Sequence, residues 1–334
     1  ILPFLRIGGM QLFHLEGDDP YEKFLPKISS VISKIVIIYL ILTIILFGLY
    51  YVNGMSLFDA IAHSFSTIST GGFSTHDQSF AYFENNWILL IAIIFMILGS
   101  FPFLVLAKTN IKNPFAAFKD HQVKIFLLLL LISICLIYFF AQKYLIGTDI
   151  QKIIIISFNT ISIISGTGFI SENFEGWGNY ASTLFLILMF IGGCAGSTTG
   201  GIKIFRFQIL LKYITIHLKK MLQPHAVIAS HFNGKKIQDS TYESVMIFFF
   251  IYILTFAFSA LLLSFSGLDF LTCFSAAASA ISNVGPGLGE IIGPEGNYGS
   301  LTTYAKIILI FTMFLGRLEM LTILVLFLPS FWKN

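Results

Sequence analysis

The chain has 334 residues, of which 56% are apolar and only 11% are charged, and its mean hydropathy is +0.85. A soluble domain carries about 25% charged residues, so this composition excludes that class, and 37 phenylalanines exclude a disordered chain. The net charge of +3 gives no support for a nucleic-acid partner. The three cysteines stand at no metal-ligand spacing and are expected to be small buried residues. The class that remains is a polytopic membrane protein.

The first residues predict the end of a helix rather than its start. The chain opens at Ile1 with no methionine and without the basic region that begins a signal peptide. We therefore expect residues 1–27 to hold the last turns of a membrane helix and a cytoplasmic linker. On this interpretation the N-terminal part of the architecture is missing from the sequence.

Six apolar runs are long enough to cross a bilayer as helices. A helix rises about 1.5 Å per residue, and the hydrocarbon core is about 30 Å thick. In lipid the backbone must satisfy its own polar groups, and the alternation typical of a membrane barrel is absent, so the predicted fold is all-α. The expected spans are residues 35–52, 87–107, 125–142, 180–202, 244–268 and 307–332.

The connections between these spans differ in charge. Residues 108–124 carry four lysines against one aspartate, and residues 203–236 carry seven basic residues and no acidic one. The positive-inside rule places both of these connections in the cytoplasm. The outer connections carry acidic pairs, which either attract cations or are ordinary solvated surface: Asp77 with Glu84, Glu172 with Glu175, and Glu290 with Glu295.

A short unit occurs three times between the spans. In the three copies the closing glycine follows the first glycine by 18, 21 and 18 positions: Gly54 to Gly72, Gly147 to Gly168, and Gly267 to Gly285. Each copy has a polar residue suited to cap a helix near its start: Ser56, Asp149 and Asp269. A helix of about twelve residues rises only about 18 Å, so each copy is predicted to be a re-entrant pore helix followed by extended backbone.

The turn that follows each short helix is the candidate ion site. The negative C-terminal end of a helix favours a cation, and glycine permits the backbone that aims carbonyl oxygens into a pore, where they replace water. Ordinary loops between helices are the alternative, and three copies in register favour a pore. The predicted filter residues are Ser69, Thr70, Gly71, Gly72, Ser165, Gly166, Thr167, Gly168, Ser282, Asn283, Val284 and Gly285.

The repeats also predict the domain organisation. Each module would hold a first span (M1), a pore helix, a filter turn and a second span (M2), arranged about a pseudo-four-fold pore. With the first module missing, residues 28–107 form the second, 108–213 the third and 241–334 the fourth. Residues 214–240 form a basic cytoplasmic connection.

These residues resemble the Trk/Ktr/HKT superfamily of potassium transporters, and within it the membrane subunit of the bacterial Trk uptake system. The matching stretches are residues 5–12, 63–77, 192–197, 283–289 and 316–319. The resemblance implies four repeats that each contribute one filter glycine, here Gly72, Gly168 and Gly285. The filter lacks the longer signature of tetrameric potassium channels, so its selectivity is expected to be less strict.

A glycine-rich run interrupts the fourth predicted span. It holds five glycines in ten residues, and each costs about 1 kcal/mol against alanine in a helix, so we expect an unwound segment. Close packing of helices is the alternative. We favour a gate because the run lies below the third filter turn, and the resemblance implies an intramembrane loop that blocks conduction. The predicted loop residues are Gly192, Gly193, Cys194, Ala195, Gly196, Ser197, Thr198, Thr199, Gly200 and Gly201.

Arg317 is a charge inside the sixth predicted span. A buried arginine costs at least about 2.5–3.5 kcal/mol on insertion scales. A structural ion pair with Glu319 is possible, although residues two apart on a helix do not face each other. The resemblance implies that Arg317 lies under the filter and contacts the loop, and we assign Arg317 and Glu319 to the gate.

The function expected from these features is potassium uptake across the bacterial cytoplasmic membrane, with no enzymatic activity. The residues predict a cation pore, whereas potassium as the bound ion comes from the resemblance. The resemblance also implies a homodimer and a cytoplasmic nucleotide-binding regulatory subunit, and we expect no organic cofactor. The alternative is a secondary transporter of another cation or a small solute with broken helices.

Overall fold

The computed structural model describes residues 24–107, 116–223, 231–232, 235–318, 320–327 and 329–333. The stretch 5–12 that carries part of the resemblance and the gate candidate Glu319 lie outside these residues.

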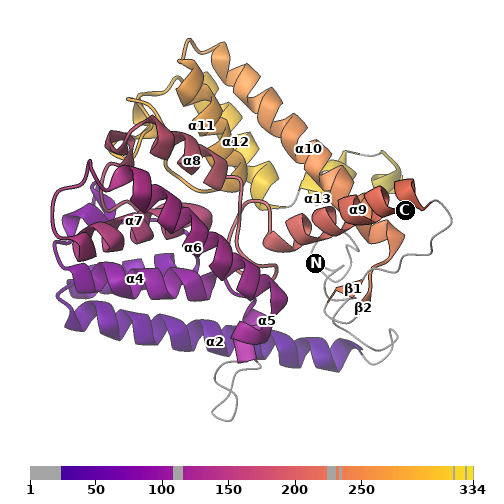
Figure 1. Ribbon diagram of the computed structural model, residues 1–334, viewed down its shortest axis with the longest axis horizontal. Helices are drawn as coiled ribbons and strands as arrows, with labels where there is room; N and C mark the ends of the chain where they lie inside the picture. Colours follow the sequence, from indigo (N-terminus) through magenta and orange to yellow (C-terminus); the bar gives the residue numbers. More distant parts are fainter. Residues whose placement is uncertain are drawn as a thin grey trace.

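The described part of the chain is all-α apart from one two-stranded hairpin (Figure 1). In chain order the α-helices are α2 (Phe24–Val52), α3 (Leu57–Ile68), α4 (Asn86–Gly99), α5 (Phe103–Leu106), α6 (His121–Ala141), α7 (Asp149–Ile164), α8 (Asn179–Leu188), α9 (Ile204–Leu222), α10 (Asp239–Ser264), α11 (Phe270–Ser282), α12 (Thr303–Arg317) and α13 (Met320–Leu326). The short 3-10 helices are η2 (Ser79–Tyr82), η3 (Ala116–Lys119), η4 (Phe174–Trp177), η5 (Tyr298–Ser300) and η6 (Pro329–Lys333). Strands β1 (His231–Phe232) and β2 (Lys235–Lys236) pair antiparallel.

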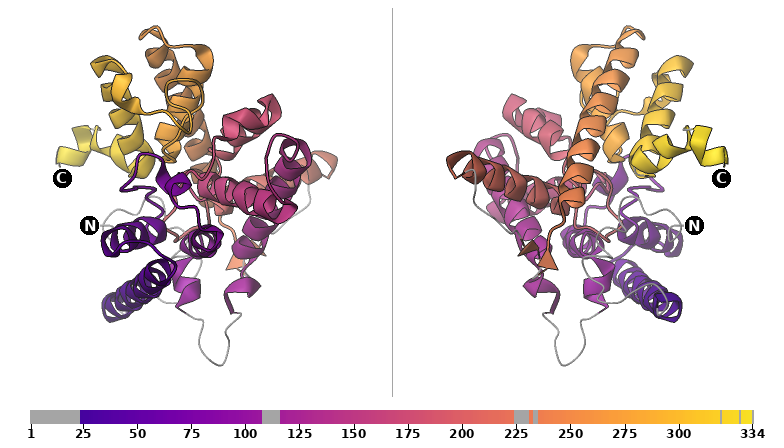
Figure 2. Two further views of the ribbon diagram at one scale, coloured as in Figure 1. Left: turned by 90° about the vertical axis from the view of Figure 1, so that its left-hand side faces the viewer. Right: turned by 90° about the vertical axis from the view of Figure 1, so that its right-hand side faces the viewer.

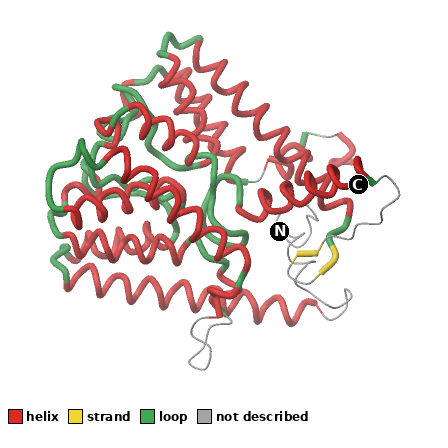
Figure 3. The backbone as a smooth tube through the Cα atoms, viewed as in Figure 1, coloured by secondary structure: helices red, strands yellow, loops and turns green. Residues whose placement is uncertain are grey.

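The helices repeat one pattern three times. A long helix, a short helix and a second helix follow one another as α2–α3–α4, α6–α7–α8 and α10–α11–α12. Within each unit the long helix packs against its short helix, and α4 of the first unit packs against α7 of the next. Figure 3 shows the connections gathered at one end of these helices and in the middle of the molecule.

Within the part of the chain that the structure describes, only the first helix of each unit is long and apolar enough to cross a membrane by itself. Among the described residues these are α2 over Ile32–Val52, α6 and α10. Large apolar side chains stay exposed along them, including Ile44 at 67% and Phe250 at 68%. In a bilayer these side chains face hydrocarbon, so their exposure is favourable rather than costly.

The second helices are shorter than the sequence predicted. The span expected over 87–107 breaks after α4, because Pro102 has no N–H to continue the helix, and resumes as α5. The helix expected over 180–202 ends as α8, before the glycine run begins. The span expected over 307–332 breaks after α12, where Gly316 packs tightly against the Ile281 carbonyl.

The short helices begin almost as predicted. Ser56 and Asp269 cap α3 and α11 by accepting hydrogen bonds from the backbone of Asp59 and Thr272. The prediction of Asp149 as a cap is wrong, since Thr148 caps α7. Thr148 forms a capping box with the third helical residue and leaves Asp149 as the first residue of the helix.

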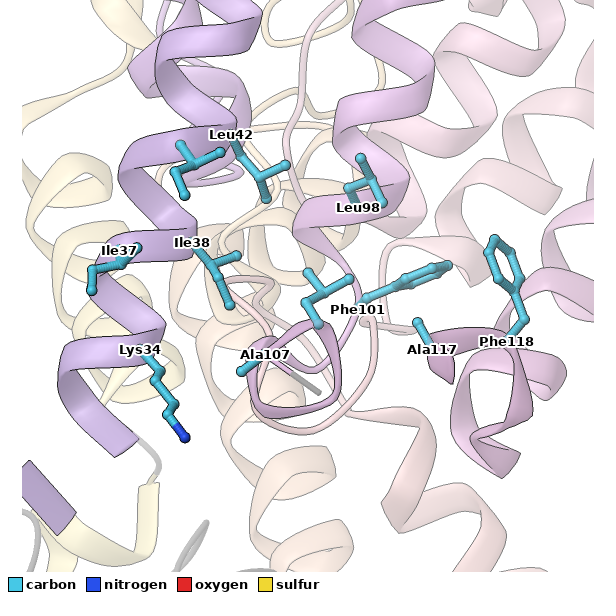
Figure 4. Close-up of a pocket in the computed structure, with 11 residues that line it drawn as sticks. Lys34, Ile37, Ile38, Leu42, Leu98, Phe101, Ala107, Ala117 and Phe118 are labelled. Atoms are coloured by element: carbon cyan, nitrogen blue, oxygen red, sulfur yellow. The ribbon is translucent and has the colours of Figure 1, made fainter. Parts of the chain in front are cut away.

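An apolar groove lies beside the long helix α2 (Figure 4). Its volume is about 490 Å³, and Ile38 and Leu42 of α2 face Leu98 and Phe101 across it, with Lys34 at one edge. None of the predicted filter or gate residues is among the described residues that line it. The groove therefore lies outside the candidate ion pathway.

The contact between α10 and α12 gives a test of how the third described unit is held together. Ser259 and Thr312 are buried, and their hydroxyls lie 2.8 Å apart. Ser259→Ala should lower the free energy of unfolding by about 0.6 kcal/mol, the usual worth of such a bond in a membrane protein. Unfolding in mixed micelles measures this, with Ser264→Ala as the control because Ser264 is exposed and bonds within its own helix. Equal losses in both variants would contradict the assignment.

Candidate functional site

The three short helices end in the same hydrogen-bonded turn. In each, the residue two before the filter glycine donates to the carbonyl three residues back, and the next residue donates to the carbonyl five back, which is a Schellman motif. The first set of bonds is Thr70 to Thr67, Gly166 to Ile163 and Asn283 to Ala280, at 3.1, 3.0 and 3.2 Å. The second set is Gly71 to Ser66, Thr167 to Ser162 and Val284 to Ser279, at 2.8, 2.9 and 3.0 Å.

The backbone of each turn alternates in handedness. Two residues with positive φ flank one without it, and the φ pairs are +50° and +69° at Thr70 and Gly72, +67° and +79° at Gly166 and Gly168, and +56° and +115° at Asn283 and Gly285. Thr70 carries a β-branched side chain in this region, which costs about 1–3 kcal/mol, so the surrounding structure holds it there.

The three turns meet one another directly. A Cβ atom on Gly72 would lie 1.7 Å from the Thr167 carbonyl oxygen, and one on Gly168 would lie 1.9 Å from that of Val284. Gly72 and Gly168 therefore each touch the residue before the filter glycine of the next unit. Figure 2 shows the three units side by side around a common centre.

Buried hydroxyls stand behind the turns. Tyr50 of α2 lies 3.0 Å from the Thr67 hydroxyl, and Tyr252 of α10 lies 2.7 Å from that of Ser282. Neither tyrosine is among the site residues predicted from the sequence. A tyrosine inside an apolar run needs a hydrogen-bond partner when it is buried, and that rule could have found them.

The segment that follows the first turn is tied back to its own pore helix. The buried ring of His63 lies 2.8 Å from the Asp59 carbonyl and 3.0 Å from the Ser74 hydroxyl, so it ties the segment after Gly72 to its own pore helix. Burial raises the pKa of Glu172. Glu172 therefore loses its negative charge at a higher pH than an ordinary glutamate.

Glu175 joins two units across the outer face. Its carboxylate accepts a hydrogen bond from the backbone N–H of Gly289, and a Cβ atom on Gly293 would meet the same carboxylate at 2.7 Å. Glu175 belongs to the outer connection of the second described unit, whereas both glycines follow the filter turn of the third. A charged acceptor thus fixes the position of one filter segment relative to another.

The glycine-rich run folds into a loop closed at its base. Ile191 and Ile202 form a parallel bridge. The N–H of Gly192 donates to the Ile202 carbonyl at 2.9 Å, and the N–H of Ile204 donates to the Gly193 carbonyl at 3.1 Å. The segment is unwound, as the sequence predicted.

The far part of this loop lies against the filter turns. The Thr198 hydroxyl lies 3.1 Å from the carbonyl oxygens of both Ile68 and Gly99 and accepts a hydrogen bond from Thr70 at 3.1 Å. A Cβ atom on Gly200 would lie 2.1 Å from the Ser282 carbonyl oxygen. The loop therefore touches the first and third described filter turns at once.

The near part of the loop fills the break between α4 and α5. Cys194 donates its N–H to the Ser100 carbonyl, and Phe103 donates to the Gly196 carbonyl, both at 3.0 Å. Ala195 donates to the side chain of Gln122 at 3.0 Å. The break that receives the loop was not predicted from the sequence. Pro102 inside a predicted span was the signal that could have indicated it, because proline interrupts a helix.

Two cationic side chains donate hydrogen bonds to the loop. Arg317 donates to the Thr198 carbonyl at 3.3 Å, which is the contact expected of it, and Lys203 donates to the carbonyl and hydroxyl of Thr199. A cavity of about 290 Å³ opens beside them. Among the described residues no group of three or more His, Cys, Asp or Glu side chains is placed to hold a metal ion.

A family model described as a cation transport protein, TrkH, matches residues 1–334. The chain belongs to this family. It is 40% identical over 336 residues to the Trk system potassium uptake protein TrkI of Halomonas elongata, covering 100% of this chain and 68% of the relative. It is also 35% identical over 343 residues to the Trk system potassium uptake protein TrkH of Escherichia coli, covering 100% and 69%.

A solved structure supports the same assignment. The crystal structure of the potassium transporter TrkH from Vibrio parahaemolyticus matches with a TM-score of 0.85 and 34% identity, over 93% of this chain and 67% of the other. The chain is therefore a multi-pass protein of the bacterial cytoplasmic membrane and a transporter rather than an enzyme.

Replacing one filter glycine tests whether the turns depend on their mutual contact. Gly168→Ala would place its methyl group on the Val284 carbonyl. Because overpacking of this kind costs about 1–3 kcal/mol, we expect cation uptake to fall by about tenfold or more. Rubidium tracer uptake measures this. Gly176→Ala is the matched control, since no atom lies within 4 Å of the added carbon. Wild-type uptake by the Gly168 variant would contradict the contact.

Removing the bridge between units tests its contribution to stability. Glu175→Ala should lower the free energy of unfolding by about 1.5–3 kcal/mol, because it removes a charged acceptor from a backbone N–H. Glu175→Gln keeps an acceptor and should lose less. Thermal unfolding in detergent measures both, and the exposed Glu295→Ala serves as the control. Equal stability of all three variants would contradict the bridge.

Proposed function

We propose that this protein takes up potassium ions through a selectivity filter of backbone carbonyls, formed by the turns ending at Gly72, Gly168 and Gly285. Two relatives are named as potassium uptake proteins, which supports potassium as the ion. The observation that carries the filter is the direct contact of the three turns, each with the same alternating backbone.

The geometry suits the removal of water from a cation. The negative ends of α3, α7 and α11 are directed at the turns that would hold the ion. Carbonyl oxygens fixed by a rigid turn can replace the hydration shell, and the spacing that the turn enforces then favours one ion size. The acidic outer segments raise the local concentration of cations.

The loop of residues 192–201 is proposed as the gate. Its far part lies against the filter turns through Thr198 and Gly200, in the path that an ion would take after leaving the filter. Opening requires breaking the hydrogen bonds of Thr198 and the contact with Arg317, each worth about 0.5–1.5 kcal/mol. That sum is small enough for a bound partner or a change of membrane state to move the loop.

The module boundaries and partners belong to this proposal. We assign the second, third and fourth modules to residues 28–107, 108–213 and 241–334, joined by the basic connection 214–240. A second copy of the chain and a nucleotide-binding regulatory subunit would act on the gate from the cytoplasm. The lysines at the end of α9 provide a positive surface there.

Tracer fluxes separate this function from its alternative. In vesicles that hold the protein, rubidium should enter, sodium should enter more slowly, and a neutral solute should not enter. A secondary transporter with broken helices would carry a solute against its gradient when the coupling ion is supplied. Absence of rubidium flux would overturn the proposed function.

Neutralising the cation under the filter tests its role in the gate. Arg317→Gln removes a positive charge and its bond to the loop, so we expect rubidium uptake to rise by about threefold to tenfold, the scale of one hydrogen bond. Lys143→Gln removes an exposed cation at the outer end of α6 and should leave uptake unchanged. Unchanged uptake in the Arg317 variant would count against the gate.

A further inference from the structure

The three filter glycines are not held in the same way. Gly72 and Gly168 are wedged against carbonyl oxygens of the next turn, whereas no described atom lies within 4 Å of a Cβ atom on Gly285. Among the described residues, hydrogen bonds rather than close backbone approach hold the third turn at Gly285.

Two side chains hold Gly285 by hydrogen bonds. Its N–H donates to the Ser279 hydroxyl at 3.0 Å, and its carbonyl accepts from the Tyr298 hydroxyl at 2.8 Å. Among the described residues no side chain donates to the carbonyl of Gly72 or Gly168. The tyrosine contact is thus particular to the third described turn.

The tyrosine is itself well anchored. Its ring packs against the buried cluster between α10, α11 and α12, which includes Leu301 and Ala305. Burial raises the pKa of Tyr298 to about 12, so the hydroxyl keeps its proton at physiological pH and remains a donor. A rigid ring with a permanent donor can hold a carbonyl in one direction. That carbonyl has a second lone pair, which stays available for an ion.

We infer that Tyr298 is a positioning residue for ion selectivity, which fixes the direction of the Gly285 carbonyl and so keeps the filter from closing around sodium. The inference rests on the proposed function. A carbonyl free to move can approach a smaller cation, and discrimination between the two ions then falls.

The test compares two tyrosines, of which only Tyr298 donates a hydrogen bond to the Gly285 carbonyl. Tyr298→Phe removes the hydroxyl and keeps the ring, so the packing of the fourth module is preserved. Tyr304→Phe makes the same chemical change on α12, six residues away, where the ring is 47% exposed. The uptake of labelled rubidium and sodium is measured for each variant, reconstituted in vesicles at equal density.

We expect the sodium-to-rubidium ratio to rise by about threefold to tenfold in Tyr298→Phe alone, the scale of one hydrogen bond. Ser279→Ala, which removes the acceptor for the Gly285 N–H, should raise the ratio in the same direction. An unchanged ratio, or an equal fall of both fluxes, would overturn the inference and leave the proposed function standing. A wild-type protein that carries neither ion would overturn the proposed function and this inference with it.

Discussion

The architecture depends on the contact between a filter glycine and the carbonyl oxygen of the next turn. At Gly72 and Gly168 this approach leaves no room for a side chain, so each turn fixes its neighbour. The Schellman motif that ends each pore helix sets the left-handed residue from which the alternating backbone starts. Local hydrogen bonding therefore shapes each turn, and close packing of backbone on backbone assembles the turns into one site.

The irregularities of the second helices follow from the need to place a loop beneath that site. The helix α8 ends early so that the loop of residues 192–201 can begin, and the break between α4 and α5 receives the near part of the loop. In a membrane, free backbone groups need partners inside the protein. The loop and the broken helix satisfy each other, which explains why two interruptions distant in sequence occur at one level of the structure.

Much of this arrangement could be predicted from the sequence, because membrane spans, helix caps and glycine turns have local patterns. The three repeats and the unwound loop follow from such patterns, whereas the role of the glycines in a filter stays a prediction. The break at Pro102 was missed because its span is otherwise uniformly apolar, and the cap at Thr148 was displaced by one residue. The contact of Glu175 could not be predicted, since it joins positions 114 residues apart that only the assembled units bring together. The contact of Tyr298 could not be predicted because it depends on how the outer connection folds back over the turn 13 residues earlier.

The most direct test of the central claim is to locate a bound ion. Diffraction or electron microscopy of the protein in thallium or rubidium should show a peak at the centre of the three turns, within coordination distance of the carbonyl oxygens next to Gly72, Gly168 and Gly285. Replacing the ion by a bulky organic cation should remove that peak. A strong peak elsewhere in the membrane region, with none at this centre, would contradict the account.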